Sequence, residues 1–135
     1  METMANAPES VTKAVVRAIN RQDVDAIAAL LSPSHRFVDS LGNVVEGREA
    51  MRKGWRGYFA LVPDYTLAID ETHGSGPVVL LLGMAHGTYA RGGKLLPEDA
   101  WRTPIAVRVQ VEDGLVAEWR VYADNEPIRK RMAKV

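Results

Sequence analysis

The chain has 135 residues, with 17 Lys and Arg residues balanced by 17 Asp and Glu residues, and it contains no cysteine. This charge balance leaves no net positive field that would favour a nucleic-acid partner. The lack of cysteine excludes disulfides, thiol chemistry and cysteine-based metal sites. The length suits one domain, which we expect over residues 8–133, and such a domain buries roughly two thirds of its unfolded surface.

The first residues predict a disordered lead-in over residues 1–7. The opening METMANAPES lacks the charged start and apolar core of a signal peptide. No apolar run approaches the ~18 residues of a membrane span. We therefore expect a cytoplasmic protein that does not contact a membrane. The basic run Arg129-Lys130-Arg131 is typical of the last turn of a helix, where cations complement the helix dipole.

The first half of the chain predicts three helices and a short hairpin. Apolar residues recur at helical spacing over residues 11–19, and Asp23 is a good N-cap for a second, short helix. A strand at residues 37–39 and a turn at Gly42-Asn43 lead to Val44-Val45, which can pair back. A third helix over residues 47–61 is ended by Pro63. Its apolar stripe consists of Met51, Trp55, Tyr58, Phe59 and Val62.

The second half alternates with the period of strands. We expect strands at residues 65–72, 77–89, 104–112 and 115–123, with a hairpin at Asp113-Gly114 and a final helix at residues 127–133. Residues 91–97 are predicted to be a loop. This order indicates an α+β fold, in which a curved antiparallel sheet carries helices on one face.

Asp39 is a candidate general base. It follows the apolar residues Phe37 and Val38 and precedes the aromatic helix. A carboxylate held against an apolar wall has a raised pKa and can take up a proton near neutral pH. The alternative is a turn aspartate that accepts hydrogen bonds from the backbone near Gly42.

The order and spacing of several segments resemble the nuclear transport factor 2-like (NTF2-like) superfamily, specifically its SnoaL-like and ketosteroid-isomerase-like branch, over roughly residues 10–132. The resemblance implies a cone-shaped sheet that wraps around a long helix and leaves an apolar pocket at its open end. Members of this superfamily include enzymes and pure binding modules, so the fold does not decide function. The segments that carry the resemblance are residues 20–23, 37–42, 46–50, 59–65, 111–114 and 122–124.

The resemblance also assigns roles to single residues. Asp39 matches the general base of the ketosteroid isomerases, but the position of their oxyanion tyrosine falls at Val15 and that of their protonated acid at Ala106 or Val107. A steroid isomerase is therefore not expected, since each lost donor costs about 10²–10³ in rate. Asp124 matches the acid/base carboxylate of the SnoaL-like cyclases. The alternative is that Asp124 caps the final helix.

The last predicted strand has two alternating faces. Periodicity alone buries its apolar face, whereas the resemblance turns its polar face toward the pocket. Both can hold if a partner subunit covers the outer face of the sheet, so we expect a homodimer through that face. Arg120 next to Asp39 or Asp124 would bind a carboxylate or a polarised oxygen. Alternatively, Glu118 and Arg120 are surface ions. The polar face carries Glu118, Arg120, Tyr122 and Asp124, and the apolar face carries Leu115, Ala117, Trp119, Val121 and Ala123.

The strand over residues 77–89 carries three small residues on one face, Gly83, Ala85 and Gly87. They either leave room for a ligand or let the sheet bend. His86, on its other face, is either an acid in the pocket or a half-buried structural residue. His35 and His73 are expected at the surface. The three histidines lack the spacing of metal ligands, so we assign no metal and no cofactor.

Aromatic residues are expected to line or cover the pocket, since the core of a cone fold is also its pocket wall. The segment over residues 91–100 is a candidate lid. The predicted substrate-binding set is Val15, Trp55, Tyr58, Phe59, Tyr89, Trp101, Val107, Glu118 and Tyr122.

Two functions follow from these residues. The first is a cofactor-free acid/base enzyme for a small apolar metabolite, in which Asp39 or Asp124 moves a proton beside a carbonyl. Tyr58, His86 or Arg120 would polarise the oxygen during isomerisation, aldol-type cyclisation or dehydration. A variant is an epoxide hydrolase that uses an Asp-Arg-Asp set. The second function is a non-catalytic ligand-binding or interaction module with the same pocket.

Overall fold

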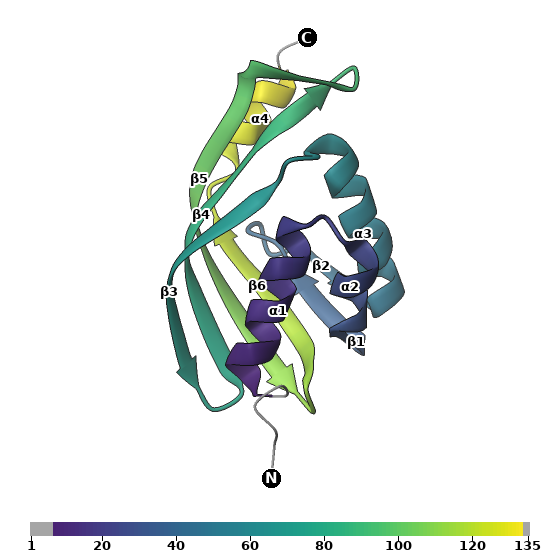
Figure 1. Ribbon diagram of the computed structural model, residues 1–135, viewed down its shortest axis with the longest axis vertical. Helices are drawn as coiled ribbons and strands as arrows, with labels where there is room; N and C mark the ends of the chain where they lie inside the picture. The colour runs from purple at the N-terminus through teal and green to yellow at the C-terminus, as the bar shows by residue number, and fades with distance from the viewer. Residues whose placement is uncertain (1–6, 134–135) are drawn as a thin grey trace.

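The computed structural model describes residues 7–133 and shows an α+β fold, as predicted (Figure 1). A curved six-stranded sheet has the order β2-β1-β6-β5-β4-β3. Helices α1, α2 and α3 lie on its concave side, and α4 lies at one end. The predicted lead-in over residues 1–7 lies outside the described residues, except for Ala7. The elements are α1 (Pro8–Asn20), α2 (Val24–Ala29), β1 (Leu31–Val38), β2 (Val44–Glu46), α3 (Arg48–Leu61), β3 (Thr66–Ser75), β4 (Val78–Arg91), β5 (Lys94–Glu112), β6 (Leu115–Ala123) and α4 (Glu126–Ala133).

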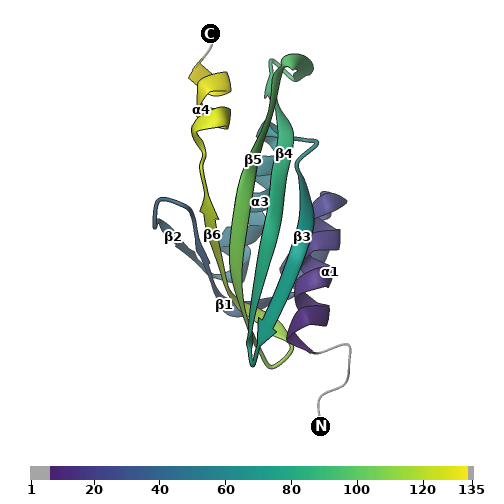
Figure 2. The same ribbon diagram turned by 90° about the vertical axis from the view of Figure 1, so that its left-hand side faces the viewer.

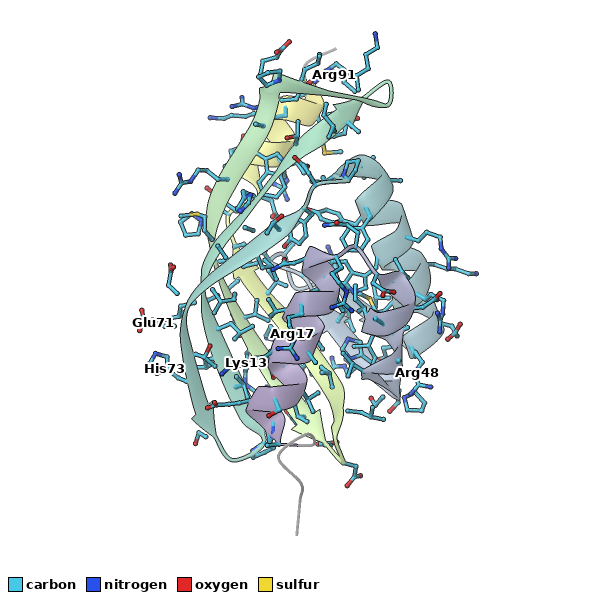
Figure 3. All side chains as sticks on the ribbon, viewed as in Figure 1. Lys13, Arg17, Arg48, Glu71, His73 and Arg91 are labelled. Atoms are coloured by element: carbon cyan, nitrogen blue, oxygen red, sulfur yellow. The ribbon has the colours of Figure 1, made fainter. Side chains whose placement is uncertain are left out.

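The helices form where apolar spacing and capping residues indicate them. Helix α1 buries Val11, Val15 and Ile19 against the sheet. Asp23 caps α2, because its carboxylate accepts a 3.0 Å hydrogen bond from the amide of Ala26. At the start of α3, Arg48 donates two hydrogen bonds to the carbonyl of Leu31 and so joins this helix to β1 (Figure 3).

The sheet is mixed rather than wholly antiparallel. Strands β1 and β2 pair antiparallel, as Val44-Val45 predicted, but β1 pairs parallel to β6 with Phe37 opposite Trp119. Strands joined by a tight hairpin must run antiparallel. Most of the chain separates β1 from β6, so their connection imposes no such direction.

The loop predicted over residues 91–97 is wrong, and the candidate lid over residues 91–100 is mostly strand. Strand β4 extends to Arg91, Gly92 and Gly93 form a turn with positive φ angles of 58° and 78°, and β5 begins at Lys94. The guanidinium of Arg91 lies 3.1 Å from the buried carboxylate of Asp99 and also donates to the carbonyl of Arg131 in α4. Figure 3 shows Arg91 at the end of the sheet where α4 lies. The hairpin is therefore fixed to α4 and is not a free lid.

His35 is buried, contrary to the prediction. Its side chain is 1% exposed and its Nδ1 donates a 2.8 Å hydrogen bond to the carbonyl of Val116. Burial lowers the pKa of His35, because the charged ring would lose its water. His73 is exposed, as expected, and lies 3.0 Å from Glu71 at the outer edge of β3 (Figure 3).

The small residues of β4 serve two purposes. A Cβ atom at Gly83 would lie 2.1 Å from the carbonyl oxygen of Ala68, so glycine permits the close approach of β3. The β3–β4 register shifts beside this point, between Ile69 and Glu71, and the sheet bends. Ala85 instead faces the cavity described below. Gly83 therefore fits the interpretation that small residues let the sheet bend, and Ala85 fits the interpretation that they leave space beside the sheet.

In the described part of the chain, residues 7–133, no helix lies in front of the convex face of the sheet (Figure 2). The exposed apolar residues on its strands include Leu80, Leu82 and Tyr122. Within residues 7–133, no helix is both long enough and apolar enough to cross a membrane.

Candidate functional site

A cavity of about 340 Å³ lies against the concave face of the sheet, beside α3. We refer to it as the cavity throughout. Its wall is built from β1, α3, the start of β3 and the inner faces of β4, β5 and β6. Most of these side chains are aromatic or aliphatic. The wall consists of Phe37, Asp39, Ser40, Val45, Met51, Gly54, Trp55, Tyr58, Tyr65, Leu67, Ala85, Trp101, Thr103, Ile105, Trp119, Val121, Ala123 and Asn125.

The aromatic part of the wall is arranged around Trp55 of α3. The Phe59 ring stacks on Trp55 at 5.3 Å between centroids, and the Tyr58 ring meets Trp55 edge-on at 6.4 Å. Tyr65 lies 6.4 Å from Trp55 and 6.1 Å from Trp101. Rings at these separations pack favourably, and each gains stability beyond its buried area. The wall is therefore a packed aromatic surface, which suits a flat apolar ligand.

Asp39 lies at the solvent-exposed end of the cavity and belongs to a tight turn. Its Oδ1 accepts 2.9 Å hydrogen bonds from the amides of Leu41 and Asn43, and its Oδ2 accepts a 3.2 Å bond from the Asn43 side chain. Partial burial alone would raise the pKa of Asp39, but these hydrogen bonds together outweigh it and lower that pKa. Of the two interpretations of Asp39, these contacts match the turn aspartate rather than the desolvated base.

Two other residues close this end. The side-chain amide of Asn125 donates a 2.6 Å hydrogen bond to the hydroxyl of Ser40, which links the β1–β2 turn to the segment before α4.

Asp124 is exposed, and its carboxylate accepts a 2.9 Å hydrogen bond from the amide of Glu126 at the start of α4. Asp124 is absent from the cavity wall. This contact with Glu126 spans two residues and is an Asx turn immediately before α4, close to the capping role of the alternative interpretation.

The inner end carries two phenols, Tyr58 and Tyr65, whose rings meet edge-on at 5.0 Å. Burial raises the pKa of Tyr58 to about 12. Burial also raises the pKa of Tyr65, with a further contribution from the neighbouring Tyr58. Both hydroxyls therefore stay protonated at neutral pH and can donate hydrogen bonds.

Tyr65 is held in place by the end of α1. The side-chain amide of Gln22 donates a 2.6 Å hydrogen bond to the carbonyl of Tyr65. Asn20 forms a two-bond pair with the backbone of Leu67, at 2.9 Å and 3.0 Å. The backbone from the Tyr65 carbonyl to Leu67 is thus fixed to the end of α1, which helps to hold the Tyr65 ring in position.

Comparison with known proteins places the chain in a family. The SnoaL-like domain family matches residues 12–119, most of the chain. The protein belongs to the SnoaL-like domain family. A search of curated proteins finds no match.

Several solved structures share this SnoaL-like fold. A candidate SnoaL-like polyketide cyclase from Shewanella denitrificans is 12% identical, with a TM-score of 0.81 over 95% of this chain and 98% of that chain. IdmH, a candidate polyketide cyclase from Streptomyces antibioticus, is 19% identical, with a TM-score of 0.77 over 93% and 98%. An NTF2-like protein from Burkholderia thailandensis is 21% identical, with a TM-score of 0.78 over 98% of each chain. These likenesses support the NTF2-like fold.

The polar face of β6 does not face the SnoaL-like cavity, and the expectation that it would is wrong. Trp119, Val121 and Ala123 line the cavity instead. Arg120 and Glu118 lie on the opposite face, where they contact each other at 3.3 Å. Tyr122 is 53% exposed on that face. Simple alternation had indicated this arrangement. Among residues 7–133, the cavity wall includes Asp39 but no arginine, so the described wall lacks the Asp-Arg-Asp set that the epoxide alternative requires.

His86 is also outside the cavity. It is exposed on the convex side of β4, opposite Arg102 of β5, in a shallow depression with Asp70. The position of His86 therefore matches neither interpretation, since it is not in the pocket and it is not half-buried. Tyr89 is not in the cavity wall either, and its ring lies under the guanidinium of Arg91 at 5.4 Å.

The remaining predicted residues divide between wall and core. Trp55, Tyr58 and Trp101 line the cavity. Val15, Val107 and Phe59 are buried in the core without lining it. Sequence reasoning assigned no site role to Tyr65, Thr103, Trp119 or Asn125. The alternation of β6 was the available signal for Trp119, and the position of Tyr65 at the start of a strand beside the aromatic helix was the signal for Tyr65.

Within residues 7–133, no three His, Asp or Glu side chains are grouped so that they could hold a metal ion. The polar groups of the cavity wall are hydroxyls, amides, indoles and one carboxylate. These groups can bind and orient an organic ligand. The arrangement therefore indicates a small-molecule site.

Proposed function

We propose that this SnoaL-like protein binds an apolar ring compound in the cavity. The observation that carries the proposal is the aromatic wall around a space of about 340 Å³, which lies within the ~300–1,000 Å³ of ligand pockets. Filled at the ~0.74 density of protein interiors, this space holds a compound of about 250 Å³. Such a volume suits two or three fused rings.

Tetralin, a fused two-ring hydrocarbon, is a suitable first probe, and its binding can be followed by tryptophan fluorescence. Ala85→Leu adds bulk inside the cavity and is expected to weaken binding at least tenfold. Ala60→Leu adds the same bulk on the exposed side of α3 and should leave binding unchanged. Equal affinity in wild type and Ala85→Leu would contradict binding in this cavity.

Proton transfer next to a carbonyl is a second candidate function. Within the described part of the chain, Asp39 is the one Asp or Glu side chain in the cavity wall. Its lowered pKa keeps it ionised at neutral pH but makes it a weaker base than a desolvated aspartate. Binding is therefore the stronger proposal, and catalysis by Asp39 is the alternative.

Exchange of the α-protons of a cyclic ketone in D₂O, measured by NMR, tests Asp39 directly. If Asp39 is the base, Asp39→Asn lowers the protein-catalysed exchange rate about 10²-fold or more. The asparagine keeps an oxygen that can accept the turn hydrogen bonds. Asp124→Asn serves as a matched control because Asp124 lies outside the cavity. Equal exchange in wild type and Asp39→Asn would rule Asp39 out.

We also propose a homodimer through the convex face of the sheet. Leu82 of β4 lies opposite Ala106 of β5, which lies opposite Tyr122 of β6. Leu82 is 37% exposed and Leu80 is 44% exposed, so this row exposes apolar surface that a second copy would cover. Light scattering should give about twice the 14.9 kDa chain mass. Leu82→Glu should produce monomers, while Leu61→Glu on α3 should not, and a wild-type monomer would contradict the proposal.

A further inference from the structure

We infer that the ligand of the cavity carries a positively charged nitrogen, as in an organic ammonium ion, which the aromatic wall and the charge of Asp39 bind together. This inference rests on the proposed ligand binding and deepens it, since it names the charge of the ring compound. Three properties of the cavity wall support it: aromatic faces, one negative charge and, among residues 7–133, no positive charge.

The first property is the aromatic content of the wall. The face of an aromatic ring carries partial negative charge, so it attracts a cation, and tryptophan attracts cations most strongly. All three tryptophans of the chain line the cavity, together with one phenylalanine and two tyrosines. These six side chains are Phe37, Trp55, Tyr58, Tyr65, Trp101 and Trp119.

The rings around Trp55 face in different directions. Phe37 and Tyr58 each lie 6.4 Å from Trp55 between centroids, at interplanar angles of 78° and 83°. Phe37 also lies opposite Trp119 in the register of β1 and β6. Rings set at such angles line adjacent sides of one space, where a compact cation can contact more than one ring within the ~6 Å range of the attraction. The wall thus suits a trimethylammonium-like group as well as a flat ring.

The second property is the charge of Asp39, which follows Phe37 by two residues and lies at the exposed end of the cavity. Hydrogen bonds from its own turn fix the carboxylate and lower the pKa of Asp39, so it is ionised at neutral pH. These bonds occupy lone pairs of the carboxylate but do not remove its charge. Asp39 therefore presents a fixed negative charge to a cation in the cavity.

The third property is that nothing in the described wall compensates this charge. Among residues 7–133, the wall contains no lysine, arginine or histidine. Arg120 lies on the opposite face of β6, where its guanidinium is 3.3 Å from the carboxylate of Glu118. Burial lowers the pKa of His35, so its ring is neutral at neutral pH. A cleft with one sign of charge and apolar walls attracts ions of the opposite sign, so the cavity should prefer a cation to a neutral compound or an anion.

The positions of these groups also orient the ligand. Asp39 lies at the exposed end, whereas the rings of Tyr65 and Trp101, 6.1 Å apart, belong to the inner wall. The ammonium group therefore lies toward Asp39, and the apolar ring packs against the inner aromatic residues. A charge at the exposed end keeps part of its water, which reduces the cost of moving it out of the solvent.

A matched ligand pair provides the test. Phenyltrimethylammonium and tert-butylbenzene have the same shape and differ by one charged nitrogen in place of a carbon. The quaternary ion has no N–H group, so a difference in affinity reports its charge rather than a hydrogen bond. Isothermal titration calorimetry should show that wild type binds the ammonium about tenfold more tightly. Added salt should weaken the binding of the ammonium but not that of tert-butylbenzene.

Asp39→Asn tests the negative charge. The variant should bind phenyltrimethylammonium about fivefold more weakly and tert-butylbenzene with unchanged affinity. The asparagine keeps an oxygen that can accept the turn hydrogen bonds. Asp113→Asn is the matched control, because it removes the same charge from the β5–β6 hairpin, outside the cavity wall, and it should change neither affinity.

Fluorinated tryptophan tests the aromatic faces without changing the fold. Fluorine withdraws electrons from the indole ring and weakens its attraction for a cation, while the size of the ring hardly changes. Because all three tryptophans line the cavity, biosynthetic replacement of tryptophan by a fluorinated analogue alters rings of the wall alone. The affinity for phenyltrimethylammonium should fall about two- to fivefold, and the affinity for tert-butylbenzene should not.

The outcomes separate the inference from the proposal on which it rests. If wild type binds tetralin but binds the ammonium no more tightly than tert-butylbenzene, the inference is wrong and ligand binding stands. If Asp39→Asn or the fluorinated rings weaken both members of the pair equally, these groups act only through the shape of the cavity, and the inference is again wrong. If wild type binds none of the three compounds, the proposed function fails, and the inference fails with it.

Discussion

The two ends of the cavity differ in how their polar groups are satisfied. At the exposed end, the carboxylate of Asp39 accepts three hydrogen bonds from its own turn, and its pKa is lowered. At the inner end, Tyr58 and Tyr65 have no partner within the described chain, and their pKa values are raised. The carboxylate of Asp39, which stood out in the sequence, is thus already hydrogen-bonded within its own turn. Two phenols in an aromatic cluster remain free to form hydrogen bonds with a ligand.

This difference shows that availability, rather than residue type, decides which group can form hydrogen bonds with a ligand. A carboxylate is the stronger base, but its lone pairs at Asp39 already serve the turn. A phenol is a modest donor, yet in an apolar wall without competing acceptors its hydrogen bond is directed at whatever enters. Five measurements test this contrast, from the largest expected effect to the smallest.

Tyr65→Ala is expected to lower the free energy of unfolding by about 3–5 kcal/mol, as for other buried aromatic residues replaced by alanine. Tyr65→Phe should change it by less than about 1 kcal/mol, because the lost hydroxyl has no partner within the folded core. Urea denaturation measures both values. A phenylalanine variant as unstable as the alanine variant would mean that the hydroxyl has a structural partner.

Alkaline pH should destabilise the protein through the phenols. The unfolded tyrosine has a pKa near 10 and Tyr58 has a folded pKa of about 12, so the unfolded chain loses its proton first. The stability contributed by the protonated form is present below pH 10 and is lost as the pH rises toward 12, by on the order of 2 kcal/mol for Tyr58. Urea midpoints at stepwise higher pH should fall less in Tyr58→Phe. If the urea midpoints of wild type and Tyr58→Phe fall equally as the pH rises, burial of the Tyr58 hydroxyl is contradicted.

Asp39→Ala is expected to cost about 1–2 kcal/mol, similar to the loss of a capping residue, because the turn amides of Leu41 and Asn43 lose their acceptor. Asp39→Asn should cost less. Thermal denaturation of both variants gives the comparison, and an unchanged melting temperature in Asp39→Ala would show that the turn bonds contribute nothing.

Acid pH distinguishes Asp39 from His35. The lowered pKa of buried His35 means that stability falls as the pH drops below its unfolded value near 6.5, in wild type and in Asp39→Asn alike. The lowered pKa of Asp39 adds stability that is present above its ordinary value of 3.8 and is lost below it. The wild-type and Asp39→Asn curves should therefore converge only at that lower pH.

Ser40→Ala should have the smallest effect, below about 1 kcal/mol, since it removes one partly exposed hydrogen bond to Asn125. Hydrogen exchange of the amides in residues 39–43 should nevertheless become faster, because the turn loses its link to the segment before α4. Unchanged exchange there would indicate that the link does not restrain the exposed end of the cavity.

Local patterns predicted most of the fold. Asp23 marked the start of α2, Asp113-Gly114 marked the last hairpin, and the alternation of β6 placed Trp119 on the buried face, as observed. Long-range features were not predictable in this way. The parallel pairing of β1 with β6 joins segments that are distant in sequence, and the extension of β5 to Lys94 depends on its pairing with β4.

The site was less predictable than the fold, because it depends on the direction of single side chains. The resemblance suggested an inward Arg120, and the strand alternation correctly indicated the opposite. At Asp39, the sequence allowed both a desolvated base and a turn residue. The hydrogen bonds from the amide and the side chain of Asn43 to the Asp39 carboxylate favour the turn residue. Tyr65 belonged to the alternating pattern of a predicted strand, but that pattern could not show its contact with Tyr58 of the preceding helix, which depends on the packing of α3 against the sheet.

The position of β6 in the sheet has a consequence for synthesis of the chain. It lies between β1 and β5 and therefore joins the pair β1–β2 to the strands β3–β5. On the ribosome, residues 31–46 emerge early and can form the β1–β2 pair, but this pair cannot join the rest of the sheet until residues 115–123 follow. Pairing over such sequence separations slows folding and prolongs the exposure of apolar surface. The sheet of the nascent protein therefore cannot be completed before its sixth strand is available.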